Sequence, residues 1–166
     1  MSMATARQTQ SNSDIWITPQ DIDRALQCYP KRNRFISEAY YSRRMLAASA
    51  VRFPHPFHEP WIEHFTREHT VTYATQASYL LIQSAIDAGD FPYLTRNHYD
   101  HVCRSELGLM SKITVRFHRA ATVPSCVPIV AKIQSVRQLQ DSVYAKCDYK
   151  LGDICSMEAW LTAPVG

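Results

Sequence analysis

Apolar side chains recur at helical spacing in one long segment near the middle of the chain. From Thr75 onward these positions are Ala77, Leu80, Leu81, Ala85 and Ile86. They cover more than one face of the helix, as is typical of a helix largely enclosed by other elements. Gly89 follows as a helix end. The pattern predicts a buried central helix over 75–88.

Extended segments stand on both sides of this helix along the chain. Before it, residues 35–42 and 45–53 have alternating or mixed apolar character and are joined by a short Ser-Arg-Arg turn. After it come four segments rich in β-branched and aromatic residues, at 109–119, 127–136, 142–149 and 156–162. Their connections are short, which favours antiparallel pairing.

Shorter signals complete the outline. The sequence Thr-Pro-Gln-Asp at 18–21 is typical of a helix start, and that helix should end near Tyr29, before a proline. Three prolines within 54–60 force a loop. We expect a short strand over 61–65 and a short helix over 99–104.

The predicted order is a helix, two or three strands, a long central helix and four strands. An antiparallel sheet wrapped around one apolar helix satisfies this order, which makes the fold class α+β with a hot-dog arrangement. An unrelated α+β sandwich is the alternative. At 166 residues the chain suits a single domain, expected over 15–166 after a polar, disordered tail over 1–14.

Composition narrows the function classes. The formal net charge is only +3 and the basic residues are scattered, so we expect no nucleic-acid partner, whereas a small anionic group such as a phosphate is easier to accommodate. The five cysteines form no CxxC pair, and their odd number without a secretory signal indicates reduced thiols and a cytoplasmic location. No apolar run is long enough to span a membrane.

His69 is the first candidate for chemistry, because it stands near the predicted helix start beside Thr70, Thr72 and Thr75. The free N–H groups and the dipole of a helix N-terminus polarise a carbonyl oxygen, while a neighbouring histidine moves a proton. The alternative is that Thr72 or Thr75 is the N-cap and His69 is an ordinary loop side chain.

Gln83 is the second candidate, because it interrupts the apolar run of the central helix. One interpretation is that its amide makes a structural hydrogen bond or partly faces solvent. The other is that its amide orients a water or a thioester carbonyl. The spacing of His55, His58, His64 and His69 does not support a metal site. There is also no Gly-x-Ser-x-Gly sequence for a serine triad.

Three basic residues, Lys112, Arg116 and Arg119, follow a strand pattern with apolar neighbours. One interpretation is that they form the solvated face of an edge strand. The other is that they bind the phosphates of coenzyme A or of a carrier protein's phosphopantetheine arm.

With these features the chain resembles the FcoT-type acyl thioesterases, a hot-dog family. It also resembles their relatives in β-amino-acid and isonitrile lipopeptide biosynthesis, which add glycine to an α,β-unsaturated acyl thioester. The resemblance runs from about Ile22 to Ala163 and rests on the order of its best stretches. These are Leu-Gln-Cys-Tyr at 26–29 with Phe-Ile-Ser-Glu-Ala-Tyr-Tyr-Ser at 35–42, then 73–86, 99–117, and Ser-Met-Glu-Ala-Trp-Leu at 156–161.

The resemblance implies roles for particular residues. Tyr29 stands where the family has an active-site tyrosine, and Gln83 stands where it has a helix asparagine. The family's helix opens with Gly-His-Phe-Asn, but here that position reads Val-Thr-Tyr-Ala at 71–74, and Thr66 replaces a tyrosine. His69 is the nearest histidine that can take the vacant role.

These features together predict an enzyme that hydrolyses acyl thioesters or adds an amine such as glycine to an enoyl thioester. We expect His69 as the base, Thr72 and Tyr29 as hydrogen-bond partners, and Gln83 as an orienting amide. The expected substrate-binding residues are Thr66, Tyr73, Thr75, His58, Arg116, Lys112 and Arg119.

We expect no metal, and no cofactor beyond the coenzyme A or phosphopantetheine of the substrate. The expected partners are acyl-CoA or an acyl-carrier protein and, for a hot-dog subunit, a second copy in a homodimer or larger homo-oligomer. A non-catalytic acyl-binding homologue is one alternative function. A dehydratase or isomerase on carrier-bound enoyl chains is the other.

Overall fold

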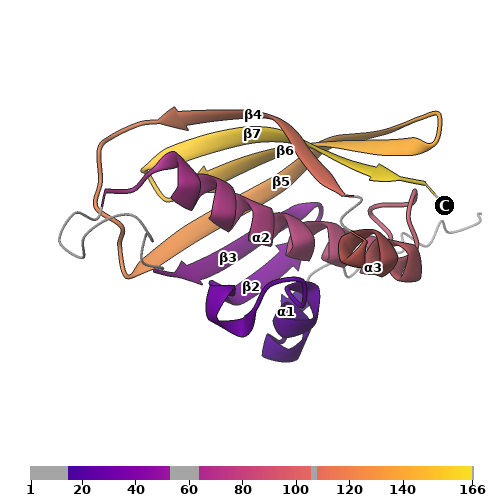
Figure 1. The fold of residues 1–166 in the computed structure, drawn as a ribbon, viewed down its shortest axis with the longest axis horizontal. Helices are drawn as coiled ribbons and strands as arrows, with labels where there is room; N and C mark the ends of the chain where they lie inside the picture. The colour runs from indigo at the N-terminus through magenta and orange to yellow at the C-terminus, as the bar shows by residue number, and fades with distance from the viewer. Residues whose placement is uncertain (1–14, 53–63, 106–107, 166) are drawn as a thin grey trace, which may run out of the picture.

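The computed structural model describes residues 15–52, 64–105 and 108–165. The predicted tail over 1–14 and the candidate His58 lie outside this part of the chain. A strongly curved antiparallel sheet wraps around one long helix (Figure 1). Its seven strands follow the order β1-β2-β3-β5-β6-β7-β4. Their bounds are β1 Ile15–Ile17, β2 Ile36–Ser42, β3 Met45–Val51, β4 Leu109–Phe117, β5 Cys126–Leu139, β6 Ser142–Leu151 and β7 Cys155–Pro164.

The strands form where buried and exposed side chains alternate. In β6 the inward positions include Val143, Ala145, Cys147 and Tyr149, while every second residue faces outward. Six of the strands predicted around the central helix are confirmed within a few residues at each end. The short strand predicted over 61–65 lies mostly outside the described residues, and His64 within it forms an isolated bridge with Thr122. β1 was not predicted, because three residues are too few to establish an alternation; it forms by pairing with β2.

The long helix is α2, Arg67–Asp87. It begins at Arg67 rather than at Thr75, so the predicted helix start was wrong. The apolar spacing does not extend into the first two turns, and Thr66 is the N-cap. The predicted end at Gly89 is confirmed: this glycine has φ +77, and its N–H and that of Asp90 bond to Ile86 O and Ala85 O at 3.0 and 2.8 Å.

Two short helices flank α2. α1, Pro19–Ala25, begins at the predicted threonine cap and packs against β2 and α2. α3, Arg96–Arg104, begins earlier than predicted, with Thr95 as its N-cap, and packs against α2. No helix among the described residues has both the length and the apolar character needed to cross a bilayer.

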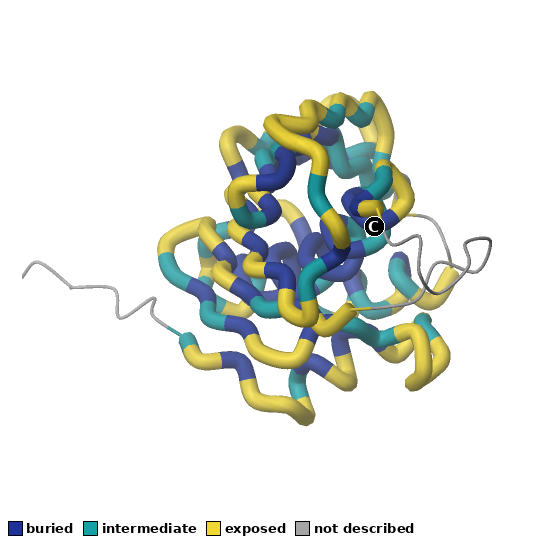
Figure 2. Tube along the Cα trace, turned by 90° about the vertical axis from the view of Figure 1, so that its left-hand side faces the viewer, coloured by how far each residue is buried: buried dark blue, intermediate teal, exposed yellow. Residues whose placement is uncertain are grey.

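The core lies between α2 and the concave face of the sheet. Buried positions gather in the interior, and exposed ones lie outside (Figure 2). Gln76, fully buried on α2, satisfies its amide by accepting from Phe35 N at 2.8 Å and donating to Asn33 O at 2.6 Å. This pair of bonds fixes the segment between α1 and β2 against the central helix.

Candidate active site

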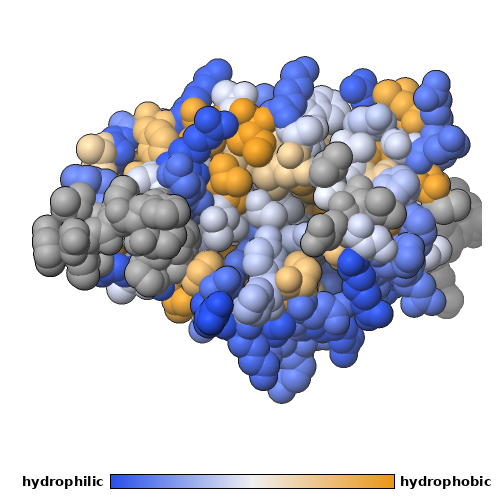
Figure 3. Space-filling view, in the orientation of Figure 1, coloured by the Kyte–Doolittle hydropathy of each residue, from blue (hydrophilic) through white to orange (hydrophobic). Residues whose placement is uncertain are grey.

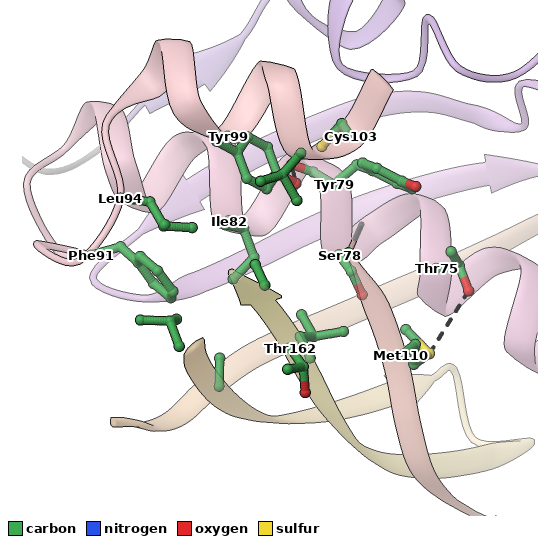
Figure 4. A pocket seen from close by; sticks show the side chains of 16 residues that line it. Thr75, Ser78, Tyr79, Ile82, Phe91, Leu94, Tyr99, Cys103, Met110 and Thr162 are labelled. Carbon is green, nitrogen blue, oxygen red and sulfur yellow. Dashed lines mark hydrogen bonds between the residues drawn. The ribbon is translucent and has the colours of Figure 1, made fainter. Parts of the chain in front are cut away.

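A cavity of about 100 Å³ lies beside the C-terminal half of α2. Side chains from α2, α3, β4, β6, β7 and the loop after α2 enclose it (Figure 4). Its apolar lining includes Ile82, Phe91, Leu94, Val102, Met110, Val143, Ala145, Leu161 and Ala163. A cavity so lined suits a short hydrocarbon group.

Hydroxyl groups interrupt this apolar lining, among them those of Thr75 and Ser78 on α2 and of Thr162 on β7. Thr75 Oγ1 donates to Val71 O at 2.7 Å and lies 3.8 Å from Met110 Sδ. Ser78 Oγ donates to Ala74 O at 2.7 Å and is 2.6 Å from the phenol oxygen of Tyr149, buried on β6. The polar end of the cavity is therefore the end nearer to the middle of α2.

Helix α3 covers the other side of the cavity and is held at several points. Arg96 forms ion pairs with Asp87 of α2 and, at 3.2 Å, with Asp100 of α3. His98 Nε2 lies 2.9 Å from the carbonyl oxygen of Pro164, at the end of β7. Tyr99 OH donates to Tyr79 O on α2 at 3.2 Å. These contacts tie α3 to both of its neighbours across the cavity.

The two thiols nearest to this region differ in exposure. Cys103 of α3 lines the cavity, and burial raises the pKa of its thiol to about 11. Cys28, after α1, is exposed. All five cysteines are free thiols.

His69 lies in the first turn of α2, not in a loop before it. Its Nδ1 is 3.2 Å from the backbone nitrogen of Thr66 and 2.8 Å from the Thr66 hydroxyl. The ring stacks on Phe65 at 5.5 Å and is 1% exposed. Because Nδ1 accepts the N–H of Thr66, the neutral ring carries its proton on Nε2. Neither Thr72 nor Thr75 caps this helix.

A wider groove of about 450 Å³ opens at the same end of α2. Thr66 and Arg119, two predicted substrate-binding residues, line it together with Arg67, His118 and Phe117. Arg119 forms two hydrogen bonds to Asp153, at 3.0 and 2.8 Å, and these raise the pKa of its guanidinium. This groove is the more basic of the two hollows along α2.

Lys112 and Arg116 lie elsewhere. Val115 packs against the core, so Arg116 beside it faces away from α2, in register with Ser156 of β7. Lys112, at φ +51, belongs to a bulge in β4. Both contribute, after Lys146, to lowering the pKa of Glu158. Both residues lie on the solvated face of an edge strand, which is the first of the two interpretations given for them from the sequence.

Gln83 and Tyr29 lie near the opposite end of α2 from His69. Gln83 is 5% exposed and lines a small space beside α1 and α3. At 1.5 Å per residue it is about 21 Å along the axis from His69. Tyr29 packs edge-on against Tyr79 at 5.9 Å, and burial, with a smaller contribution from Cys28, raises the pKa of its phenol to about 12. The structure therefore does not bring these two residues to His69.

Tyr73 and Thr72 complete the predicted set. Tyr73 is fully buried and donates to Val51 O at 3.1 Å, so its hydroxyl ties α2 to β3. Thr72 is half-buried, one turn beyond His69. Of the predicted residues, Thr66, His69 and Thr72 come together in the first two turns of α2, and Thr75 lies at the cavity.

The residues that build most of the cavity were not predicted from the sequence. Ser78 and Tyr79 lie on α2, Phe91 and Leu94 follow it, and Tyr99 lies on α3. The available signal was the pair of hydroxyl residues Thr75 and Ser78, spaced one turn apart within an apolar helix.

No protein-family model matches the sequence, and no curated protein matches it. Several solved structures are similar. Thioesterase superfamily member 2 of zebrafish matches at a TM-score of 0.52 and 15% identity, over 89% of this chain and 94% of that one. The dehydratase domain of RzxB from Pseudomonas fluorescens matches at a TM-score of 0.55 and 9% identity, over 97% of this chain and 53% of that one. GphF dehydratase 1 matches at a TM-score of 0.52 and 11% identity, over 91% of this chain and 51% of that one.

This chain thus spans nearly all of the zebrafish thioesterase and about half of each dehydratase chain. Identities of 9 to 15% demonstrate a common fold and nothing finer. That fold, an antiparallel sheet wrapped around a long central helix, is the hot-dog fold. The α+β hot-dog fold predicted from the sequence is therefore confirmed.

Proposed function

We propose that this protein is a hot-dog enzyme that acts on acyl thioesters and releases the acyl group by hydrolysis. The observation that carries the proposal is the apolar cavity beside α2, which is lined by Ile82, Phe91 and Leu94 at one end and by the Thr75 hydroxyl at the other (Figure 4). A hydrocarbon chain gains free energy by leaving water for such a cavity. The fold, shared with a thioesterase and two dehydratases, supports the same class of substrate.

In this proposal the acyl chain lies in the cavity and the thioester group lies near Thr72 and Thr75. The carrier arm then extends along α2 toward the groove at Thr66 and Arg119. Thr66 and Thr75 are about 14 Å apart along the helix axis, so an extended linker is needed between the two hollows. Two guanidinium groups line that groove, Arg67 and the Asp153-bound Arg119, and they are the cations proposed to meet a phosphate of coenzyme A or of an acyl-carrier protein.

His69 is the proposed base. Because Nδ1 is held by the cap, proton transfer would use Nε2. A general base contributes about 10²–10⁴-fold to a rate. Thr72 is the proposed hydrogen-bond partner. We assign no step at the same carbonyl to Tyr29 or Gln83, which lie beside the C-terminal half of α2, away from His69.

A finer proposal follows from the resemblance to the FcoT-type enzymes and their dual-function relatives. In it, an amine such as glycine adds to the β-carbon of an enoyl thioester before hydrolysis. We also propose, as expected for a hot-dog subunit, that the working form is a homodimer or a larger homo-oligomer, and that it is cytoplasmic.

The competing proposal is an acyl-binding protein without catalysis, and a specific observation favours it. His69 already serves as the helix cap, and it is almost fully buried. In that case the cavity would bind the acyl group and His69 would only stabilise α2.

One experiment separates these proposals. Saturated and 2-enoyl thioesters of coenzyme A and of an acyl-carrier protein are incubated with the protein, with and without glycine. Thiol release is followed, and the acyl products are identified by mass spectrometry. Free acid indicates hydrolysis, and a glycine adduct indicates addition. A 3-hydroxyacyl product would identify the dehydratase reaction in its hydration direction. Binding without any product would indicate the non-catalytic homologue.

A further inference from the structure

The hydroxyl groups of Thr75 and Ser78, on the α2 side of the cavity, have already committed their protons. A serine or threonine hydroxyl has one O–H donor and two acceptor lone pairs. Thr75 gives its proton to Val71 O, and Ser78 gives its proton to Ala74 O, both at 2.7 Å. Such bonds to the carbonyl four residues earlier are a common use of these residues inside helices.

Tyr149 extends the same pattern. Its phenol oxygen lies 2.6 Å from Ser78 Oγ. Because the single proton of Ser78 goes to Ala74 O, the proton in this second bond must come from Tyr149. All three hydroxyl protons are then used within the protein. What remains on Thr75 and Ser78 for a ligand is lone pairs, which are acceptors only.

These oxygen atoms are turned toward the cavity. In Figure 4 the Ser78 and Thr75 hydroxyl oxygens project from α2 toward the sheet strands that carry Thr162 and Met110. The described residues that line the cavity include no carboxylate and no cation. A charged ammonium group would therefore lose its hydration without gaining a counter-ion, whereas a neutral hydroxyl would gain an acceptor.

We propose that the cavity selects a short acyl group bearing a hydroxyl near its thioester end, with Thr75 and Ser78 as the residues that determine this preference. This inference rests on the proposed function, which supplies the acyl thioester. The acyl hydroxyl donates to the Ser78 or Thr75 oxygen, and the rest of the chain packs against Ile82, Phe91 and Leu94. The same two residues do not serve as donors to the thioester carbonyl.

The size of the cavity limits the chain. An apolar cavity of roughly 150 Å³ holds one benzene molecule. The cavity here, at about 100 Å³, is smaller, so we expect an acyl group of no more than about six carbons.

The test is a binding experiment that requires no turnover. Amide analogues of acyl-pantetheine, in which NH replaces the thioester sulfur, are titrated into the protein by calorimetry. The acyl groups are butanoyl, 3-hydroxybutanoyl, 3-oxobutanoyl and 4-hydroxybutanoyl. One additional hydrogen bond is worth up to about tenfold in affinity, so 3-hydroxybutanoyl should bind up to about tenfold more tightly than butanoyl. The oxygen of the 3-oxo group would turn its lone pairs toward the lone pairs of Thr75 and Ser78. The 4-hydroxyl would lie at the apolar end of the cavity, near Ile82, Phe91 and Leu94. Both compounds should therefore bind more weakly than 3-hydroxybutanoyl.

Two variants make the test specific. Thr75→Val removes one acceptor with little change of shape. The double variant Ser78→Ala with Tyr149→Phe removes the other acceptor without leaving a buried phenol unpaired, which a single Ser78→Ala change would do. Combined, these changes should abolish the preference, so that the variant binds 3-hydroxybutanoyl and butanoyl with affinities within about twofold of each other.

The outcomes separate the two proposals. Equal affinity of the wild-type protein for butanoyl and 3-hydroxybutanoyl, or tighter binding of the 3-oxo compound, would overturn the selection for a hydroxyl and leave the acyl-thioester proposal intact. A preference that survives in the combined variant would remove Thr75 and Ser78 as its cause. If no acyl analogue binds to the folded protein, both proposals fail.

Discussion

His69 and Thr66 hold each other at the start of the central helix. The imidazole Nδ1 accepts the backbone N–H of Thr66 at 3.2 Å and lies 2.8 Å from the Thr66 hydroxyl. The side chain three residues into a helix often returns to the cap in this way, although glutamate or glutamine is the usual residue. A histidine at this position stabilises α2 and can also exchange a proton. Substitutions at His69 and at Thr66 separate the capping role from the proton-transfer role.

The variant His69→Gln should separate capping from proton transfer. A glutamine amide can still accept from the Thr66 N–H, so we expect thermal stability close to that of the wild type. Without a base, turnover of acyl thioesters should fall by about a hundredfold or more. Steady-state rates of purified, folded protein provide the measurement, with His101→Ala, an exposed histidine on α3, as the control. Unchanged turnover in His69→Gln would mean that His69 is only a cap.

Removal of the N-cap should affect stability. Thr66→Ala leaves orphan N–H groups in the first turn of α2, and loss of such a cap costs about 1 kcal/mol. Urea unfolding should register this loss, whereas Thr72→Ala, a half-buried position within the helix, should change stability by much less. Equal effects of the two substitutions would contradict the capping role.

Stability at high pH should depend on Tyr29. Burial raises the pKa of this phenol from 10.0 to about 12. Its contribution is therefore complete below pH 10, where both the folded and the unfolded protein hold the proton. The contribution is lost as the pH rises toward 12, because the unfolded chain ionises first. Between pH 9 and 11.5 the wild type should lose more stability than Tyr29→Phe in urea unfolding. Parallel losses in the two proteins would argue against a perturbed Tyr29.

The length of the acyl chain should depend on Ile82, which lines the cavity. Ile82→Ala removes three carbon atoms, so the preferred thioester should become longer, at a cost in stability of about 2–5 kcal/mol. Ile22→Ala, a buried substitution on α1 away from the cavity, is the matched control. It should lower stability and leave the chain-length profile unchanged. A profile that is the same in wild type and Ile82→Ala would exclude this cavity as the acyl site.

Much of the fold could be predicted because the strands are long enough to alternate. In β6 buried and more exposed side chains alternate along all ten residues, and in β7 they alternate along the first half of the strand. β1 has only three residues and shows no such pattern, and it forms because it pairs with β2. The start of α2 was missed because its first turns contain threonines and charged residues, and their stability comes from the cap rather than from apolar spacing.

The site was harder to predict than the fold. Phe91 and Leu94, which close the cavity, become neighbours of Met110 and Ala163 only through the sheet order and the position of α3. No spacing in the sequence encodes that contact. Conversely, Gln83 and His69 both lie on α2, but their separation along its axis keeps them from acting on one carbonyl. Figure 3 shows hydrophobic side chains on the face of the molecule where α2 runs beside β4.

The central claim is that the cavity beside α2 holds the acyl chain of a thioester that the protein cleaves. The most direct test compares thiol release from short-chain acyl-CoA by the wild type and by Ala163→Phe, which fills the cavity from β7. We predict release by the wild type and a loss of about tenfold or more in kcat/KM in the variant, with both proteins folded. Absence of thiol release from every acyl thioester by the folded wild type, or equal rates in the two proteins, would contradict the account.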